Sequence, residues 1–101
     1  MAFGRKAQVV SDPRSGDRQA VVVQATARLL VGEAVPITIE NLSSSGFRAA
    51  IPLDLKPGML LRIGLPTGRS PHAIVARVDG DQYGCAFTAP LDPEDLELLV
   101  S

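Results

Sequence analysis

The stretch that decides the fold is "QAVVVQATARLLV", residues 19–31. Apolar side chains occupy every second position along it, and most of its polar side chains lie at the positions between them. Because successive side chains of a β-strand point to opposite faces, and because β-branched residues favour strands, this pattern predicts one long, half-buried strand. The inward face is expected to hold Val21, Val23, Ala25, Ala27, Leu29 and Val31, and the outward face Val22, Gln24, Thr26 and Arg28.

The same alternation continues toward the C-terminus in five shorter segments, which are therefore also expected to be strands. Gly80 marks a tight hairpin between the last two of them, and Pro57-Gly58 marks another turn. The five segments are "VPITIE" (35–40), "FRAAI" (47–51), "LLRIGL" (60–65), "HAIVARVD" (72–79) and "QYGCAFT" (82–88).

The spacing changes in "LDPEDLELLV", residues 91–100, where Leu96, Leu99 and Val100 share one face at helical intervals. Asp92 is expected to cap this helix, and Pro93 suits its first position. Six short antiparallel strands in a chain of 101 residues close into a barrel or fold into a small sandwich. We expect the helix to cover an open edge or a barrel end with its leucines.

The composition is that of an ordinary globular domain, with 46% hydrophobic and 21% charged residues. A net charge of -1 and 4% aromatic residues argue against binding DNA or RNA, because phosphate backbones attract basic surfaces and single strands need stacking platforms. The start "MAFGRKAQVV" lacks the apolar run of a signal peptide, and no segment approaches the roughly 20 apolar residues of a membrane helix. We therefore expect a cytoplasmic protein without membrane insertion.

The sequence offers no set of residues for catalysis or for a metal. His72 is the only histidine and Cys85 the only cysteine, and the two belong to different predicted strands. A nucleophile with its base and orienting group, or a set of metal ligands at suitable spacing, is therefore missing. Cys85 shares a face with Tyr83 and Phe87 and is expected to be a small core residue. We expect that the protein is not an enzyme and holds no metal or cofactor.

Two polar stretches remain, "RSGDR" at residues 14–18 and "NLSSSG" at residues 41–46. Taken alone, the first would be solvated loop charges. The second would be a polar turn with Gly46 at a positive φ angle. The first stretch lies just before the long strand, and the second follows the next strand along the chain.

Together and in this order, the two stretches fit RxxxR and [D/N]xSxxG, and the sequence here resembles the PilZ domain family. "YGCAF", residues 83–87, is similar to the last-strand pattern of that family. The resemblance runs from Arg14 to the C-terminal helix, so residues 1–13 are expected to be a flexible lead-in and residues 14–101 the domain. It implies a six-stranded antiparallel β-barrel that binds the bacterial second messenger cyclic di-GMP.

The resemblance also implies the binding residues. Arg14 and Arg18 match RxxxR, and Asn41, Ser43 and Gly46 match the second motif. Guanidinium groups suit guanine edges and phosphates, and an amide such as that of Asn41 suits a guanine edge. Ser43 is expected to donate to a phosphate or to organise the turn, and a glycine lets ligand and backbone approach closely.

The leading hypothesis is a receptor without catalytic activity that signals to a separate, unknown partner protein, as a monomer or weak dimer. Ligand binding would pull residues 5–18 onto the barrel, and unchanged hydrogen exchange of that segment at saturating ligand would contradict this. The main alternative is a PilZ-like protein-interaction module that works without nucleotide. A third is an unrelated small barrel for single-stranded nucleic acid, which the charge and the few aromatic residues disfavour.

Overall fold

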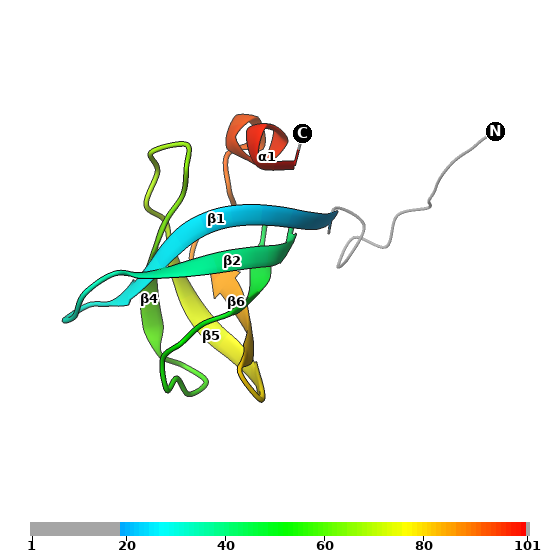
Figure 1. Cartoon of the computed structure of the whole chain (residues 1–101). Helices are drawn as coiled ribbons and strands as arrows, with labels where there is room; N and C mark the ends of the chain where they lie inside the picture. The colour runs from blue at the N-terminus through cyan, green and yellow to red at the C-terminus, as the bar shows by residue number, and fades with distance from the viewer. Residues whose placement is uncertain (1–18, 101) are drawn as a thin grey trace.

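The computed structural model describes residues 19–100, and in this range six strands precede one helix (Figure 1). All neighbouring strands are antiparallel and form a closed barrel in the order β1-β2-β3-β6-β5-β4, with β4 paired to β1. The predicted all-β barrel with a C-terminal helix is confirmed. The elements are β1 (Gln19–Leu29), β2 (Val35–Leu42), β3 (Gly46–Ala50), β4 (Leu60–Gly64), β5 (His72–Asp79), β6 (Gln82–Phe87) and α1 (Pro93–Val100).

The barrel encloses one hydrophobic core, to which every strand contributes alternate residues. Phe47 of β3 and Phe87 of β6 meet inside it, with ring centroids 5.4 Å apart. Cys85 lies buried in the same core, as the sequence predicted. The largest side chains that are fully removed from water are Ile39, Leu42, Leu61, Ile63 and Val75. Because these aliphatic residues come from β2, β4 and β5, the core depends on closure of the barrel and not on one hairpin.

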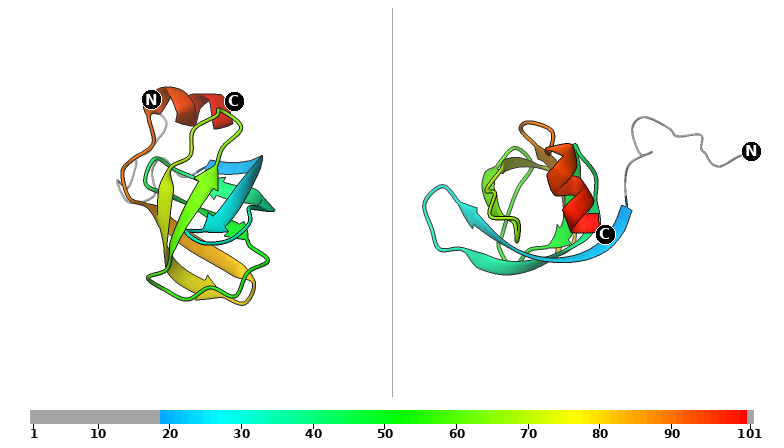
Figure 2. Two further views of the ribbon diagram at one scale, coloured as in Figure 1. Left: turned by 90° about the vertical axis from the view of Figure 1, so that its left-hand side faces the viewer. Right: turned by 90° about the horizontal axis from the view of Figure 1, so that it is seen from above.

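The hairpin that joins β1 to β2 extends beyond the barrel wall (Figures 1 and 2). At its tip Leu30 is 60% exposed and Val31 is 91% exposed. The prediction that Val31 points inward was therefore wrong. Pairing between β1 and β4 ends at Leu29, so no opposite wall exists beyond it against which an inward side chain could pack.

Helix α1 lies across one end of the barrel (Figure 2). Asp92 caps it as predicted, because its Oδ1 accepts the N–H of Glu94 at 2.9 Å. Its apolar face packs against the core through the three predicted residues Leu96, Leu99 and Val100. In the described part of the chain, no helix has the length and apolar character needed to cross a membrane.

Candidate functional site

The "NLSSSG" stretch forms a tight, polar turn between β2 and β3 that is held by Ser43. The Ser43 side chain is buried, and its Oγ accepts the N–H groups of Ser45 and Gly46 at 3.2 Å each. The N–H of Ser43 also donates to the carbonyl of Gly46 at 2.9 Å. Two roles were expected for the Ser43 hydroxyl, and in this structure it organises the turn.

Gly46 does not have the positive φ angle that the sequence suggested, and this expectation was wrong. The described glycines at positive φ are Gly32, Gly58, Gly68 and Gly80. Gly46 instead begins β3 in extended conformation and pairs with Ala86 of β6. A Cβ atom at this position would collide with the carbonyl oxygen of Cys85 on β6. The glycine is therefore required by the close approach of two strands.

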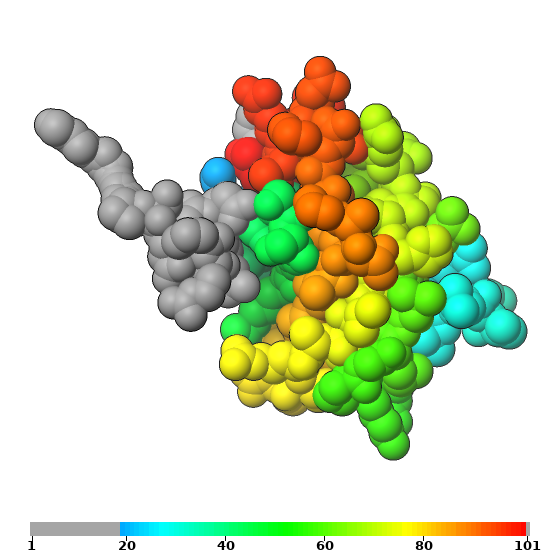
Figure 3. All heavy atoms as spheres, turned by 180° about the vertical axis from the view of Figure 1, so that it is seen from behind, coloured from blue at the N-terminus to red at the C-terminus, as the bar shows by residue number. Residues whose placement is uncertain are grey.

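The turn is also joined to the far end of β6. The carbonyl of Ser45 accepts the N–H of Phe87 at 2.9 Å, and the carbonyl of Ser44 accepts the N–H of Leu91 at 2.8 Å. Leu91 directly precedes Asp92, the cap of α1. The serine turn and the segment that leads into α1 therefore lie side by side, joined by backbone hydrogen bonds (Figure 3).

Asn41 reaches the outer face of the barrel because β2 contains a bulge. Ile39 pairs with Ala49 and Asn41 pairs with Arg48, so two steps on β2 match one step on β3. The irregularity shifts the alternation, and Leu42 becomes the next fully buried residue. Asn41 is consequently half-buried beside Arg48.

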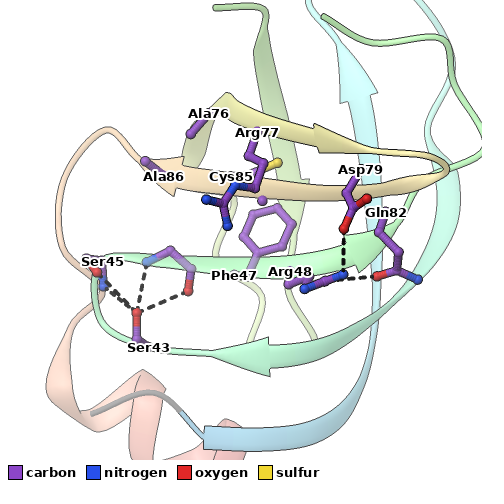
Figure 4. A pocket seen from close by; sticks show the side chains of 12 residues that line it. Ser43, Ser45, Phe47, Arg48, Ala76, Arg77, Asp79, Gln82, Cys85 and Ala86 are labelled. Atoms are coloured by element: carbon purple, nitrogen blue, oxygen red, sulfur yellow. Dashed lines mark hydrogen bonds and ion pairs between the residues drawn. The ribbon is translucent and has the colours of Figure 1, made fainter. Parts of the chain in front are cut away.

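A cavity of about 410 Å³ lies over β3, β6 and β5 on the outside of the barrel (Figure 4). Ser43, Ser45 and Gly46 form one end of it, while Asn41 lies outside its lining. Arg48 and Gln82 lie toward the other end. This volume is within the range of about 300–1,000 Å³ that is usual for small-molecule sites.

The floor of the cavity is open because β6 has a glycine there, with an arginine beside it on each neighbouring strand. Gly84 pairs with Arg48 on β3 and with Arg77 on β5. A bulge in β5, where Val75 pairs with Cys85 and Arg77 with the adjacent Gly84, turns Arg77 outward. Figure 4 shows the Arg77 side chain crossing β6 toward β3.

The two arginines differ in their electrostatic surroundings. Arg48 Nη2 lies 3.4 Å from Asp79 Oδ2, and Arg48 Nε donates to Gln82 Oε1 at 3.4 Å. Arg77 makes no ion pair with any of residues 19–100. Its guanidinium is therefore the group in the cavity most ready to bind an anion or a guanine edge.

Cys85 lies beneath the floor of the cavity and is a poor nucleophile. Burial raises the pKa of the Cys85 thiol beneath the floor to about 11, so the thiol stays protonated near neutral pH. Within residues 19–100, no three side chains of the metal-binding types come together. The arginine, glutamine and serine side chains around the cavity offer hydrogen-bond donors and acceptors to a ligand.

Of the predicted site residues, Ser43 and Gly46 line the cavity and Asn41 lies close by on the same face. Arg14 and Arg18 lie outside the described residues, as does the lead-in 1–13. The sequence prediction did not include Arg48 and Arg77. Simple alternation would have placed Arg48 outside, but no sequence signal marks the bulge that turns Arg77 outward.

No known protein family matches the sequence, and no curated protein matches it. Among solved structures, the inhibitor of motility MotI/DgrA of Bacillus subtilis is similar over 82% of this chain, with a TM-score of 0.64 and 17% identity. The chain spans 46% of the length of that protein. The PilZ domain of CeSA from a cellulose synthesizing bacterium is similar over 80% of this chain and 87% of the domain, with a TM-score of 0.58 and 18% identity. The chain thus has a PilZ-like fold.

Proposed function

We propose that this protein is a receptor for cyclic di-GMP, bound on the outer face of the barrel in the cavity over β3, β6 and β5. The observation that carries the proposal is the meeting of two groups at one cavity: the serine turn of the NxSxxG motif, and the guanidinium of Arg77, which has no ion pair among residues 19–100. The PilZ-like fold and the RxxxR stretch at Arg14 and Arg18 support it.

The chemistry of the cavity suits this ligand. Cyclic di-GMP carries two phosphates and two guanines, and a guanidinium can bind guanine O6 and N7 with two hydrogen bonds. Arg77 makes no ion pair in the described part of the chain, and the open floor at Gly84 leaves room for a flat base. The amide of Asn41 on the same face offers both a donor and an acceptor.

Strand pairing brings the start of β1 next to the second motif. Gln19, the first residue of β1, pairs with Leu42, which directly precedes Ser43. The segment with Arg14 and Arg18 is therefore joined to the barrel beside one end of the cavity. The short stretch of chain between the arginine motif and Gln19 favours one binding site shared by both motifs.

In this proposal the protein acts by binding and not by catalysis. Nucleotide binding by Arg14 and Arg18 orders residues 5–18 against the barrel and changes the surface that a partner protein contacts. The receptor works in the bacterial cytoplasm, where the nucleotide is made. The hydrogen bonds from the serine turn to Phe87 and Leu91 give a second route, toward α1.

Isothermal titration with cyclic di-GMP tests the proposal directly. We expect saturable binding to the wild type and its loss in Arg14→Ala/Arg18→Ala, because each lost charged contact costs about 1–3 kcal/mol. Arg28→Ala/Arg62→Ala removes the same charge from the β1–β4 wall and should keep the affinity. A folded wild type that gives neither heat nor a thermal shift would indicate the nucleotide-independent interaction module instead.

Ser43→Ala should lower both stability and affinity. Without Oγ, the N–H groups of Ser45 and Gly46 lose their acceptor in a part-buried turn, so the free energy of unfolding should fall by about 1–3 kcal/mol. Ser45 is exposed, and Ser45→Ala is the matched control with a smaller expected effect. Urea unfolding and titration would measure both variants. Equal losses at the two positions would contradict the role assigned to Ser43.

A further inference from the structure

Three basic side chains form a row on the wall of the barrel opposite the β3–β6 seam. Arg28 of β1 pairs with Arg62 of β4, and Arg62 pairs with His72 of β5. These three residues are called the basic row below. In the strand order β1-β2-β3-β6-β5-β4, the β1–β4 seam lies across the ring from the β3–β6 seam. The basic row is therefore distinct from the cavity proposed for the nucleotide.

The fold itself does not explain the basic row. The ion pairs among residues 19–100 are Arg48–Asp79 and Arg69–Asp95, so no carboxylate of this range pairs with the row. Like charges directly opposite each other in an antiparallel pair are destabilising. Arg28 and Arg62 face each other in this way. Such a row is expected where a partner supplies the missing negative charge.

The surface beside the basic row offers additional hydrogen-bond donors. A shallow hollow of about 210 Å³ contains Arg28 and Arg62 together with the hydroxyl residues Thr26 and Ser70. It exists because Gly64 faces Thr26, where a Cβ atom would collide with Thr26 Oγ1. Guanidinium and hydroxyl groups around one hollow are suited to carboxylate oxygens.

An exposed apolar tip adjoins the basic row. The hairpin between β1 and β2 projects from the barrel (Figure 2). Its residues Leu30 and Val31 follow Arg28 and are 60% and 91% exposed. Ala34, on the same hairpin connection, lines the hollow. Exposed apolar side chains next to unpaired arginines are the composition of a protein-binding surface, where charge gives orientation and apolar contact gives affinity.

We propose that the basic row and the hairpin tip bind an acidic, partly apolar segment of a partner protein. Neighbouring strands lie about 4.8 Å apart, so a row across three strands spans about 10 Å. Carboxylates at alternate positions of an extended segment lie about 6.5–7 Å apart and can reach successive arginines. The hollow is smaller than the usual range for small-molecule sites, and a net charge of -1 disfavours a nucleic acid.

The probe for this proposal is an acetylated hexapeptide of alternating Glu and Leu, titrated into the ¹⁵N-labelled full chain. Amide shifts should be confined to β1, β4, the start of β5 and the hairpin tip, and added salt should weaken binding. Arg28→Gln/Arg62→Gln should weaken the affinity about tenfold, the sum of two exposed ion pairs. Arg48→Gln/Arg77→Gln removes the same charge from the cavity over β3, β6 and β5 and should leave the affinity for the peptide unchanged.

Other results would overturn the proposal. Equal weakening by the two double variants would mean unspecific charge attraction. The same shifts produced by inorganic phosphate at equal concentration would mean a site for a small oxyanion. The melting temperature of Arg28→Gln/Arg62→Gln should match or exceed that of the wild type, because like-charge repulsion is removed. A lower melting temperature would show that the arginines serve the fold.

Discussion

Gly46→Ala is expected to lower the free energy of unfolding by about 1–3 kcal/mol, the usual cost of forcing extra atoms into a packed site. The added Cβ would meet the backbone carbonyl of Cys85, and a backbone cannot move aside as a flexible side chain can. The pairing between β3 and β6 would have to shift, and with it the serine turn. Urea unfolding followed by circular dichroism measures the loss.

Gly46→Asn separates the two explanations for this glycine. Asparagine tolerates positive φ angles, so it would be nearly harmless if conformational freedom were the reason. Because steric contact is the reason here, Gly46→Asn should be at least as damaging as Gly46→Ala. Gly84→Ala is the matched control on β6, since its Cβ would meet only the Cβ of Arg77 at an ordinary 3.6 Å. An unchanged unfolding curve for Gly46→Asn would refute the steric explanation.

Gly84→Val is expected to weaken nucleotide binding without lowering stability, whereas Gly46→Ala lowers stability. Valine favours strands, and its Cβ would meet only the Cβ of Arg77 at an ordinary 3.6 Å, so stability should be retained. Its methyl groups would fill the floor of the cavity between Arg48 and Arg77. Crowding of a site by about 1–3 kcal/mol corresponds to a loss of affinity for cyclic di-GMP of about 5- to 150-fold. Titration calorimetry of the folded variant measures it.

The control for Gly84→Val is a second added valine outside the cavity. Ala50 of β3 points to the same outer surface, half-buried, and does not line the cavity. Ala50→Val should therefore leave the affinity for the nucleotide unchanged. If Gly84→Val binds as tightly as the wild type while Arg14→Ala/Arg18→Ala does not bind, the nucleotide lies elsewhere on the barrel. In that case the role given to this cavity is wrong.

Much of the fold follows from local pattern. The period of two predicted the strands, Gly80 predicted the last hairpin, and Asp92 with Pro93 predicted the start of α1. These features depend on interactions between residues close in sequence, which explains why they can be recognised without a structure. Val31 was placed inward because the alternation continues past the point where strand pairing ends.

The site followed from the sequence only in part. The motif places Asn41, Ser43 and Gly46 in one turn, and the structure adds the reason for each position. Arg77 could not be found in this way. A regular strand would turn its side chain toward the core, and only the bulge opposite β6 turns it outward.

The sequence by itself thus determined six strands, a capped helix, the burial of alternate strand residues and two polar motifs in fixed order. Tertiary structure alone decided which strands become neighbours, and therefore which outward side chains meet. It placed Arg48 and Arg77 on either side of Gly84, and Arg28 beside Arg62 on the opposite wall. The physical reason is that closure and register depend on pairing between distant segments, whereas alternation depends only on the local geometry of a strand.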